Sequence, residues 1–201
     1  NAIDALRGLP AFLAEQIAAM SLDKERGLDL DALWERKKKT IEQTPGLSID
    51  RETGTFEDVA GLENLKDLAQ GLFTGRNPPK VIVRLEEIEK SLAGARKDSP
   101  GDSSGVSQDA LQTLLNAMED FNWRGLLAEG VPGSGKSLIS KVMGGQFGCL
   151  SLSADLGAMK ASLVGESEAK VRNFVKMVAA IAGKGGAFFV ATSNNSSALP
   201  P

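Results

Sequence analysis

The chain has 201 residues, of which 42% are hydrophobic and 24% charged, and its formal net charge is −3. This length accommodates one α/β domain plus a short extension, and the composition is typical of a globular protein rather than a disordered chain, a coiled coil or a membrane protein. The acidic balance disfavours general nucleic-acid binding. The chain contains no histidine, which excludes Ser-His, Cys-His and His-ligated metal mechanisms.

The single cysteine, Cys149, excludes an internal disulfide, and its apolar surroundings predict a buried structural thiol. The sequence lacks a signal-peptide pattern and a long apolar run, and together with the cysteine count this favours a cytoplasmic location. Because the chain begins at Asn1 and stops at Pro201 just after a predicted strand, we expect it to be a piece of a longer protein.

The first fifty residues have a helical pattern. Apolar residues spaced three and four apart over residues 1–20 predict an amphipathic helix, or two short helices broken near Pro10. We expect Asp31 to cap a further helix that ends near Pro45. The lysine triplet at residues 37–39 is expected to be a solvated helix face.

A turn-rich stretch, residues 47–56, predicts a joint between a helical segment, residues 1–50, and a main domain, residues 51–201. In the main domain, apolar strands alternate with helical stripes, and Ser107 is expected to cap one of the helices. This alternation predicts a parallel sheet covered by helices on both faces. Strands are expected at residues 80–85, 126–130, 149–153 and 187–192, with helices at residues 59–72, from 107, from 136 and over 166–181.

Residues 130–137 read GVPGSGKS and match the pattern G-x-x-x-x-G-K-[ST] between a predicted strand and a predicted helix. Gly133 and Gly135 allow the backbone N–H groups to point into one concavity, and the helix N-terminus adds partial positive charge, so the loop favours phosphate. In this motif Lys136 reaches the β- and γ-phosphates and the Ser137 hydroxyl binds Mg²⁺. The alternative is a degenerate loop that has the turn but no ligand.

ATP hydrolysis at such a loop also needs carboxylates at the end of a neighbouring strand. In this chain they occur upstream of the loop, where Glu86 and Glu87 follow the predicted strand at residues 80–85. The alternative interpretation of this pair is an exposed helical charge pattern with Lys90.

Several segments resemble AAA+ ATPases. Residues 85–90 (LEEIEK) are similar to the family's acidic strand end, residues 56–62 (FEDVAGL) to the opening of its domain, residues 162–168 (SLVGESE) to the segment after its second strand, and residues 190–194 (VATSN) to its sensor-1 strand. The resemblance covers about residues 56–201. Residues 5–46 resemble the helical segment that precedes this domain in chloroplast- and cyanobacterium-type AAA proteins.

The order of these motifs is unusual, because the acidic strand precedes the phosphate loop instead of following it. This order resembles bacteriophage-encoded AAA ATPases, for which the location would be the host-cell cytoplasm. The resemblance implies a three-layer P-loop NTPase core with a parallel sheet in permuted strand order, preceded by a small helical segment. A parallel sheet tolerates the permutation, because each strand still returns through a crossover helix.

The resemblance also implies the roles of individual residues. Glu87 would orient or deprotonate the attacking water, Glu86 and Ser137 would bind the metal, and Asn194 would be the polar sensor. ATP or ADP is the implied nucleotide and Mg²⁺ the implied metal, in a ring-forming homo-oligomer, expected to be hexameric, that remodels a macromolecular partner. The implied nucleotide-binding residues are Val59, Ala60, Gly61, Val131, Pro132, Gly133, Ser134, Gly135, Lys136, Ser137 and Leu138.

The chain departs from the family pattern at several positions. Glu86 stands where the family usually has Asp, which predicts slower hydrolysis. Arg84 occupies a strand position that is usually apolar and Ala60 replaces a common glycine, and the sequence explains neither. Leu163 stands where unfolding motors place an aromatic pore residue, which weakens a threading hypothesis. The arginine finger, the second sensor and the lid would lie beyond Pro201.

Two other functions remain open at this stage. One is a nucleotide switch or assembly scaffold with little hydrolysis, which turnover would distinguish from a motor. The other is a P-loop GTPase or small-molecule kinase. The chain has no N-K-x-D guanine motif, and competition between ATP and GTP would test this second alternative.

Overall fold

The computed structural model describes residues 2–6, 9, 11–24, 27–50, 54–91, 106–159 and 166–194. Its main part is a five-stranded sheet in the order β3-β6-β4-β7-β5. The strands are β3 (Leu47–Asp50), β4 (Val81–Leu85), β5 (Arg124–Glu129), β6 (Leu150–Ala154) and β7 (Ala187–Ser193). All neighbours are parallel except β3, which pairs antiparallel with β6 at the edge of the sheet.

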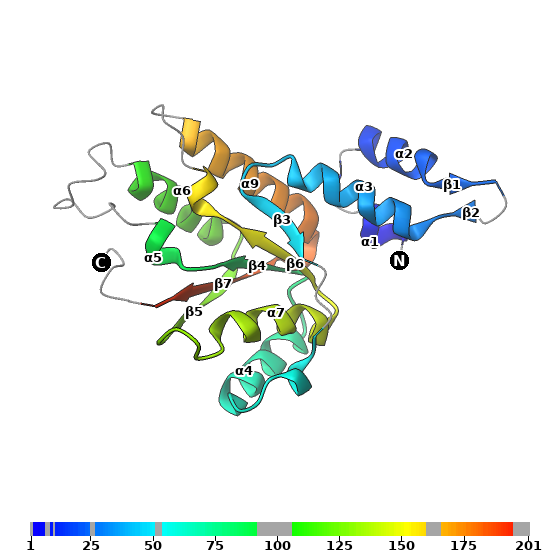
Figure 1. Cartoon of the computed structure of the whole chain (residues 1–201). Helices are drawn as coiled ribbons and strands as arrows, with labels where there is room; N and C mark the ends of the chain where they lie inside the picture. The colour runs from blue at the N-terminus through cyan, green and yellow to red at the C-terminus, as the bar shows by residue number, and fades with distance from the viewer. Residues whose placement is uncertain are drawn as a thin grey trace.

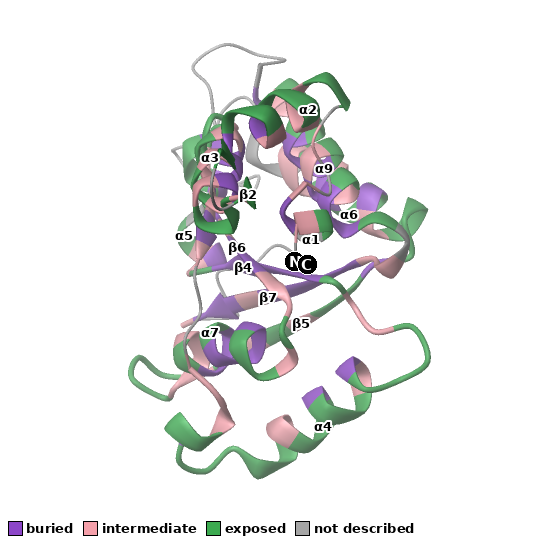
Figure 2. Ribbon diagram, turned by 90° about the vertical axis from the view of Figure 1, so that its right-hand side faces the viewer, coloured by how far each residue is buried: buried purple, intermediate pink, exposed green. Residues whose placement is uncertain are grey.

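Helices cover both faces of this sheet, as Figures 1 and 2 show. On one face, α4 (Glu63–Phe73) and α7 (Lys136–Phe147) pack against Ile82 and Phe188. On the other face, a larger apolar cluster joins Val81, Val83 and Leu85 to the long helices. The helices on that side are α5 (Ile88–Ser91), α6 (Val106–Asp120), α8 (Leu156–Met159) and α9 (Glu166–Ala182).

The predicted three-layer α/β core is therefore confirmed, with one difference. The sheet is mostly rather than wholly parallel, because residues 47–50, expected within a turn-rich joint, form strand β3. Leu47 and Ile49 alternate with Ser48 and Asp50, and this period of two buries the two apolar side chains in the core. Strand β4 lies between β6 and β7, although it precedes β5 in the sequence.

The N-terminal elements form an arm that extends away from the sheet in Figure 1. It consists of α1 (Ala2–Leu6), α2 (Ala11–Met20), a short hairpin of β1 (Leu22–Asp23) and β2 (Gly27–Leu28), and α3 (Leu30–Glu42). The arm has its own small core around Ala5, Ile17 and Leu33. The prediction of two short helices around Pro10 is confirmed.

One sequence prediction about α3 is wrong, and the prediction of a solvated lysine triplet is wrong for Lys37, although Lys39 is exposed. Asp29, not Asp31, caps the helix, because Asp29 has the extended backbone of a cap and its carboxylate accepts the N–H groups of Asp31 and Ala32 at 3.0 Å. Lys37 is buried rather than solvated. It lies four residues from Leu33 and from Ile41 on the buried stripe, with its Nζ 4.9 Å from the centre of the Trp34 ring.

The predicted elements of the main domain are present with shifted ends. Strand β5 begins at Arg124 rather than Leu126, and α6 begins at Val106, so Ser107 lies within that helix and does not cap it. Short 3₁₀ segments occur at Phe56–Asp58 and Gly183–Gly185. No helix in the described residues is long and apolar enough to cross a membrane.

Candidate functional site

The phosphate-loop motif connects the end of β5 to the start of α7, as the sequence predicts. Gly133 and Gly135 have φ angles of 81° and 86°, a left-handed backbone that residues with a Cβ rarely adopt. A Cβ on Gly130 would lie 3.1 Å from Ser134 Oγ. The three glycines therefore allow the tight turn by which the loop enters the helix.

Lys136 folds back over this loop. Its Nζ donates to the carbonyl oxygens of Gly130 and Val131 at 2.7 and 2.8 Å, and to Ser134 Oγ at 3.3 Å. These contacts hold the ammonium group in the curve of the loop, at the N-terminal end of a 12-residue helix. Positive charge from the lysine and from the helix end thus meets at one place, which suits an anion.

The segment at residues 54–62 runs beside α7. The Val59 side chain is buried against Ile139 and Val142, and the Phe56 N–H donates to Gln146 Oε1 at 3.0 Å. Leu62 lies close to the phosphate loop, because a Cβ on Gly135 would be 3.6 Å from Leu62 Cδ1. The predicted adenine segment, Val59 to Gly61, is therefore adjacent to the loop, although the Val59 side chain itself packs in the core.

Glu87 follows β4, and its backbone N–H and both of its carboxylate oxygens have partners. Its backbone N–H donates to Thr192 Oγ1 at 3.1 Å, its Oε1 accepts a hydrogen bond from Asn194 Nδ2 at 3.3 Å, and its Oε2 is 2.7 Å from Lys90 Nζ. This contact with Glu87 raises the pKa of Lys90 through the hydrogen bond and the opposite charge. Glu87 has a φ of 49°, and a left-handed backbone at a residue other than glycine is typical of functional positions.

The end of β7 contacts both the loop and the acidic strand. The Ser193 carbonyl accepts the Gly130 N–H at 3.3 Å, while the neighbouring residues Thr192 and Asn194 contact Glu87. Asn194 and Glu87 are 107 residues apart in the sequence. They meet because β7 lies between β4 and β5, with all three strands parallel, so that their carboxyl ends share one edge of the sheet.

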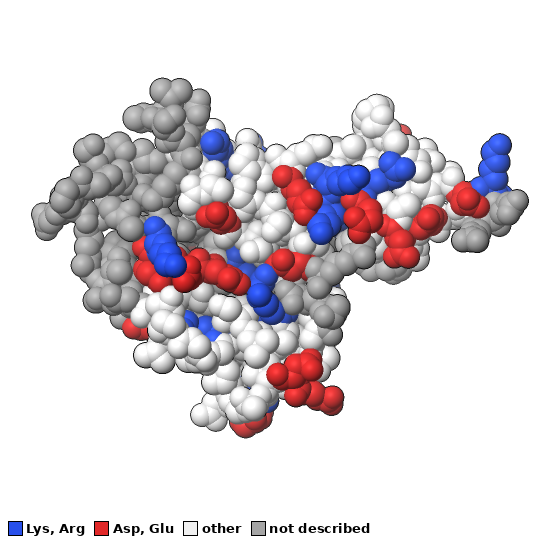
Figure 3. Space-filling view, viewed as in Figure 1, with Lys and Arg blue, Asp and Glu red and all other residues white. Residues whose placement is uncertain are grey.

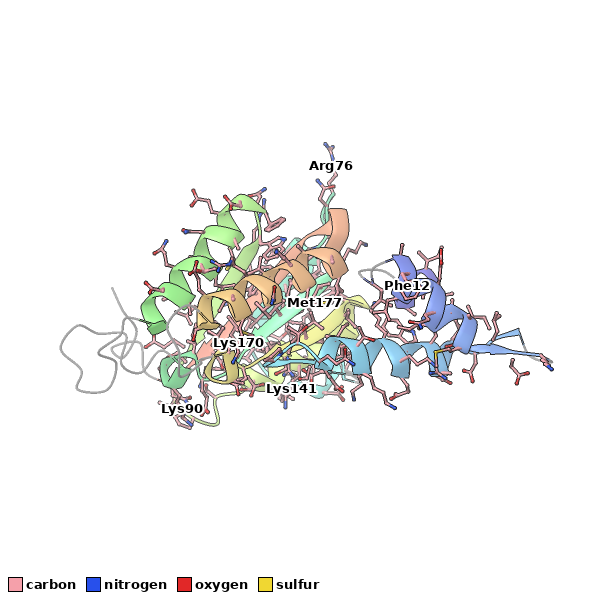
Figure 4. All side chains as sticks on the ribbon, turned by 90° about the horizontal axis from the view of Figure 1, so that it is seen from above. Phe12, Arg76, Lys90, Lys141, Lys170 and Met177 are labelled. Carbon is pink, nitrogen blue, oxygen red and sulfur yellow. The ribbon has the colours of Figure 1, made fainter. Side chains whose placement is uncertain are left out.

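Glu89 secures the backbone at this corner. Its Oε1 accepts the Asn194 N–H at 3.2 Å. Burial raises the pKa of Glu89, but hydrogen bonds from its own N–H, the Asn194 N–H and the Ser193 side chain outweigh burial and lower it overall. In Figure 3, acidic and basic side chains gather around α5, and Figure 4 labels Lys90 at this end of the sheet.

The surroundings of Glu86 differ from those of Glu87, and the sequence did not predict them. Its Oε1 is 3.1 Å from Arg84 Nη1, and Arg84 Nη2 forms a second ion pair with Asp50 on β3. No hydrogen bond joins Glu86 to Ser137 within the described part of the chain. The structure thus joins Glu87 to Asn194 directly and the loop to the neighbouring Ser193, but it does not join the predicted metal pair by a hydrogen bond.

Other predictions at the site have different outcomes. Leu163 and its neighbours at residues 160–165 lie outside the described residues. Cys149 is partly buried, with its Sγ 3.3 Å from the Pro79 carbonyl oxygen, and burial raises the pKa of its thiol to about 11. This agrees with a structural thiol. The described residues contain no group of three or more Asp, Glu or Cys residues that could hold a metal ion by themselves.

Comparison with known proteins finds relatives that are named as AAA domain-containing proteins. The chain is 45% identical over 140 residues to the AAA domain-containing protein ycf46 of Gracilaria tenuistipitata var. liui, and 36% identical over 184 residues to the ycf46 protein of Guillardia theta. These matches cover 70% and 90% of this chain but only 21% and 29% of the relatives. The chain therefore spans less than a third of their length.

The similarity to these relatives relates the chain to AAA-domain proteins, and the three-layer core is consistent with a P-loop NTPase. No protein-family model matches the chain, and no solved structure matches it. The resemblance to bacteriophage-encoded AAA ATPases stays a prediction.

Proposed function

We propose that this chain is the nucleotide-binding part of an AAA+ ATPase, which binds Mg·ATP and hydrolyses it to ADP and phosphate. The single observation that carries this proposal is the contact of the β7 end with two other segments. Ser193 bonds to Gly130 at the start of the phosphate loop, and Asn194 bonds to Glu87 at the end of β4. A carboxylate encoded before the loop thereby lies beside the strand that borders the loop.

Each proposed role follows from the chemistry of the side chain. Lys136 binds the phosphates, since its ammonium already lies in the curve of the loop. Glu87 orients the attacking water or accepts its proton, and Asn194 holds the Glu87 carboxylate through its amide. For the segment from Val59 to Gly61, a contact of its backbone with the base of the nucleotide is proposed, since the Val59 side chain is buried against α7.

The donor set fits Mg²⁺. Mg²⁺ prefers oxygen ligands and is usually bound through one or two protein groups together with phosphate oxygens and water. The Ser137 hydroxyl and the Glu86 carboxylate are such groups. When bound, the ion would stabilise charge on the phosphates.

We also propose that the whole protein works as a homo-oligomeric ring, expected to be hexameric, that remodels a macromolecular partner. This part of the proposal rests on the resemblance of the sequence motifs to AAA+ ATPases. In such a ring a neighbouring subunit completes each site. The isolated chain is therefore expected to bind nucleotide well and to turn it over slowly.

Calorimetric titration of the 201-residue chain with ATP and Mg²⁺ tests binding. Lys136→Ala should weaken binding by about 10- to 100-fold, because a hydrogen bond to a charged group contributes about 1.5–3 kcal/mol. Lys141→Ala is the matched control, because Lys141 is an exposed lysine on the same helix (Figure 4). Absence of saturable binding by the unaltered chain would refute the proposal.

Phosphate release by concentrated protein tests hydrolysis. Glu87→Gln should reduce turnover by about a hundredfold or more, because general-base catalysis typically contributes 10²–10⁴-fold, while binding of ATP is retained. Glu119→Gln, an exposed residue of α6, should leave turnover unchanged.

A nucleotide switch without hydrolysis is the second candidate. The observation that favours it is that both carboxylates are already ion-paired, Glu86 with Arg84 and Glu87 with Lys90. Binding of ATP without turnover above that of Lys136→Ala would support the switch. Preferential binding of GTP in competition would instead support the GTPase alternative.

A further inference from the structure

Arg84 is a charged residue in the middle of a buried strand. Its side chain is only 4% exposed, between the fully apolar positions Val83 and Leu85. Burying a guanidinium group is costly unless the charge is paired and hydrogen-bonded. The residues that pair with Arg84 therefore indicate why it is there.

Its two terminal nitrogens contact two different carboxylates. Nη1 lies 3.1 Å from Glu86 Oε1, and Nη2 pairs with Asp50 Oδ2. The planar guanidinium is suited to this, because it presents several donors in a rigid fork. One arginine therefore links the end of edge strand β3 to the first acidic residue after β4.

The sheet register explains how this contact forms. Arg84 is two residues from Ile82 on β4 and so shares its face of the sheet, where Ile82 packs against Met143 of α7. Glu86 follows the end of the strand and is placed beside Arg84 by their ion pair. Between β4 and β3 lies β6, where Ser153 is the partner of Arg84 and Ser151 the partner of Asp50. These small side chains leave space for the arginine to reach across β6.

We propose that Arg84 is a positioning residue for Glu86 as a ligand of the nucleotide-bound magnesium, with Asp50 as the fixed anchor of the arginine. This inference rests on the proposed function. The glutamate side chain has three rotatable bonds, and the contact with Arg84 restricts the orientation of its carboxylate. The contact uses one carboxylate oxygen of Glu86 and leaves the other for the metal.

The charges agree with this role. Asp50 and Glu86 carry two negative charges and Arg84 one positive charge, so the trio keeps a net negative charge that attracts a cation. A partner behind a metal ligand commonly orients it, and removal of such a partner typically costs about 10- to 100-fold in metal affinity. Arg84 is expected to act on the metal through Glu86 and without contact to the nucleotide.

The test measures the gain in ADP affinity that Mg²⁺ produces, by calorimetry with Mg²⁺ and with a chelator, and so needs no turnover. Arg84→Met keeps most of the side-chain length and should lower this gain about tenfold. Glu86→Gln should lower it to a similar extent. In the double variant, Arg84→Met should add no further loss, because the residue on which it acts is already altered.

Three further variants separate positioning from general stability. Arg172→Met removes another ion-paired arginine, bonded to Glu168 on α9, and should leave the Mg²⁺ gain unchanged. Arg84→Lys should keep part of the Mg²⁺ gain that Arg84→Met loses, because the lysine ammonium can pair with one carboxylate but cannot span both equally well. Asp50→Asn should lower the gain by a few fold, and it serves as the decisive variant if Arg84→Met does not fold.

An unchanged or increased Mg²⁺ gain in folded Arg84→Met or Asp50→Asn would overturn the inference. An equal loss from Arg84→Met in the presence and absence of the Glu86 carboxylate would also overturn it, because Arg84 would then act on the fold alone. If the unaltered chain binds ADP without any effect of Mg²⁺, the proposed magnesium site is refuted and this inference falls with it. If the chain binds no nucleotide, the proposed function itself fails.

Discussion

The two faces of the central sheet differ in what they bury. The face toward α6 and α9 is covered by a large, continuous apolar cluster that includes Val83, Phe174 and Val178. The face toward α4 and α7 has a smaller apolar cluster, and beside it lie the buried polar residues Arg84 and Ser151. The phosphate loop leads into α7 on this second face, whereas Glu89 and Lys90, which contact Asn194 and Glu87, belong to α5 on the first face.

This difference indicates that one face of the sheet contributes mainly to stability and the other mainly to ligand binding. The first face buries much apolar surface, and such burial is the main favourable term in folding. The second face can then hold charged groups that contribute little to stability, because the cost of desolvating a buried ion pair often cancels its attraction. The comparison predicts that substitutions on the first face change mainly stability, whereas those on the second change mainly ligand binding.

The largest stability effect is expected for Phe174→Ala on α9. Phe174 is fully buried in the large cluster, and its truncation should lower the free energy of unfolding by about 3–5 kcal/mol. Phe12→Ala is the matched control, because Phe12 is 75% exposed on the N-terminal arm, and it should change stability by about 0.5 kcal/mol or less. Urea unfolding measures both, and equal losses would contradict the comparison.

A smaller effect is expected for Gly145→Ala on α7, where backbone contact rather than apolar volume is limiting. A Cβ on Gly145 would lie 2.1 Å from the Gly54 carbonyl oxygen. The segment at residues 54–62 would have to move, at a cost of about 1–3 kcal/mol, and nucleotide affinity should fall with it.

Gly71→Ala on α4 is the control for this change. A Cβ on Gly71 meets no atom within 4 Å, so alanine should stabilise this helix by about 0.5–1 kcal/mol. Thermal unfolding of both variants, with nucleotide titration of Gly145→Ala, distinguishes the two sites. Gly145→Ala with unchanged stability would show that the segment is not held tightly against α7.

The smallest effect concerns Cys149, which packs beside the smaller cluster. Because burial raises the pKa of its thiol to about 11, a neutral alkylating reagent should react slowly at pH 8 and faster as the pH approaches 11, since the thiolate is the reactive form. As the pH rises, the Cys149 thiol of the unfolded chain ionises before that of the folded chain, near its ordinary pKa of 9.0. The free energy of unfolding should therefore decrease as pH rises from about 9 to about 11.

Mass spectrometry of the alkylated chain is unambiguous here, because Cys149 is the only cysteine. The urea-unfolded chain at the same pH provides the reference rate. Equal rates at pH 8 for folded and unfolded protein would contradict burial of the thiol.

The sequence predicted the phosphate loop well, because its glycines and its lysine are local features with a local mechanism. The helix that starts at Lys136 and the strand at Val81–Leu85 were also predictable, from the phosphate-loop motif and from an apolar run interrupted only by Arg84. The ends of other elements were less predictable, as the cap at Asp29 shows. Asp29 and Asp31 are the same residue type, and only their backbone geometry decides which of them caps the helix. The sequence does not reveal that geometry.

The contacts of Arg84 illustrate what the sequence did not predict. Arg84 was an unexplained departure from an apolar strand, and Asp50 was part of an expected joint. Their ion pair depends on the antiparallel addition of β3 to β6 and on the register of two strand pairs. Lys37 is a similar case, since its burial depends on where the α3 stripe packs.

By itself, the sequence determined which chemical groups are available to this protein, namely a glycine-rich loop with a lysine, carboxylates at a strand end and no histidine. Those features depend on residue type and on short spacings, which local backbone geometry converts directly into structure. Only the tertiary structure decided which distant groups meet, such as Glu87 with Asn194 and Arg84 with Asp50. Strand order and register set these meetings, and they result from packing of the whole sheet rather than from any local pattern.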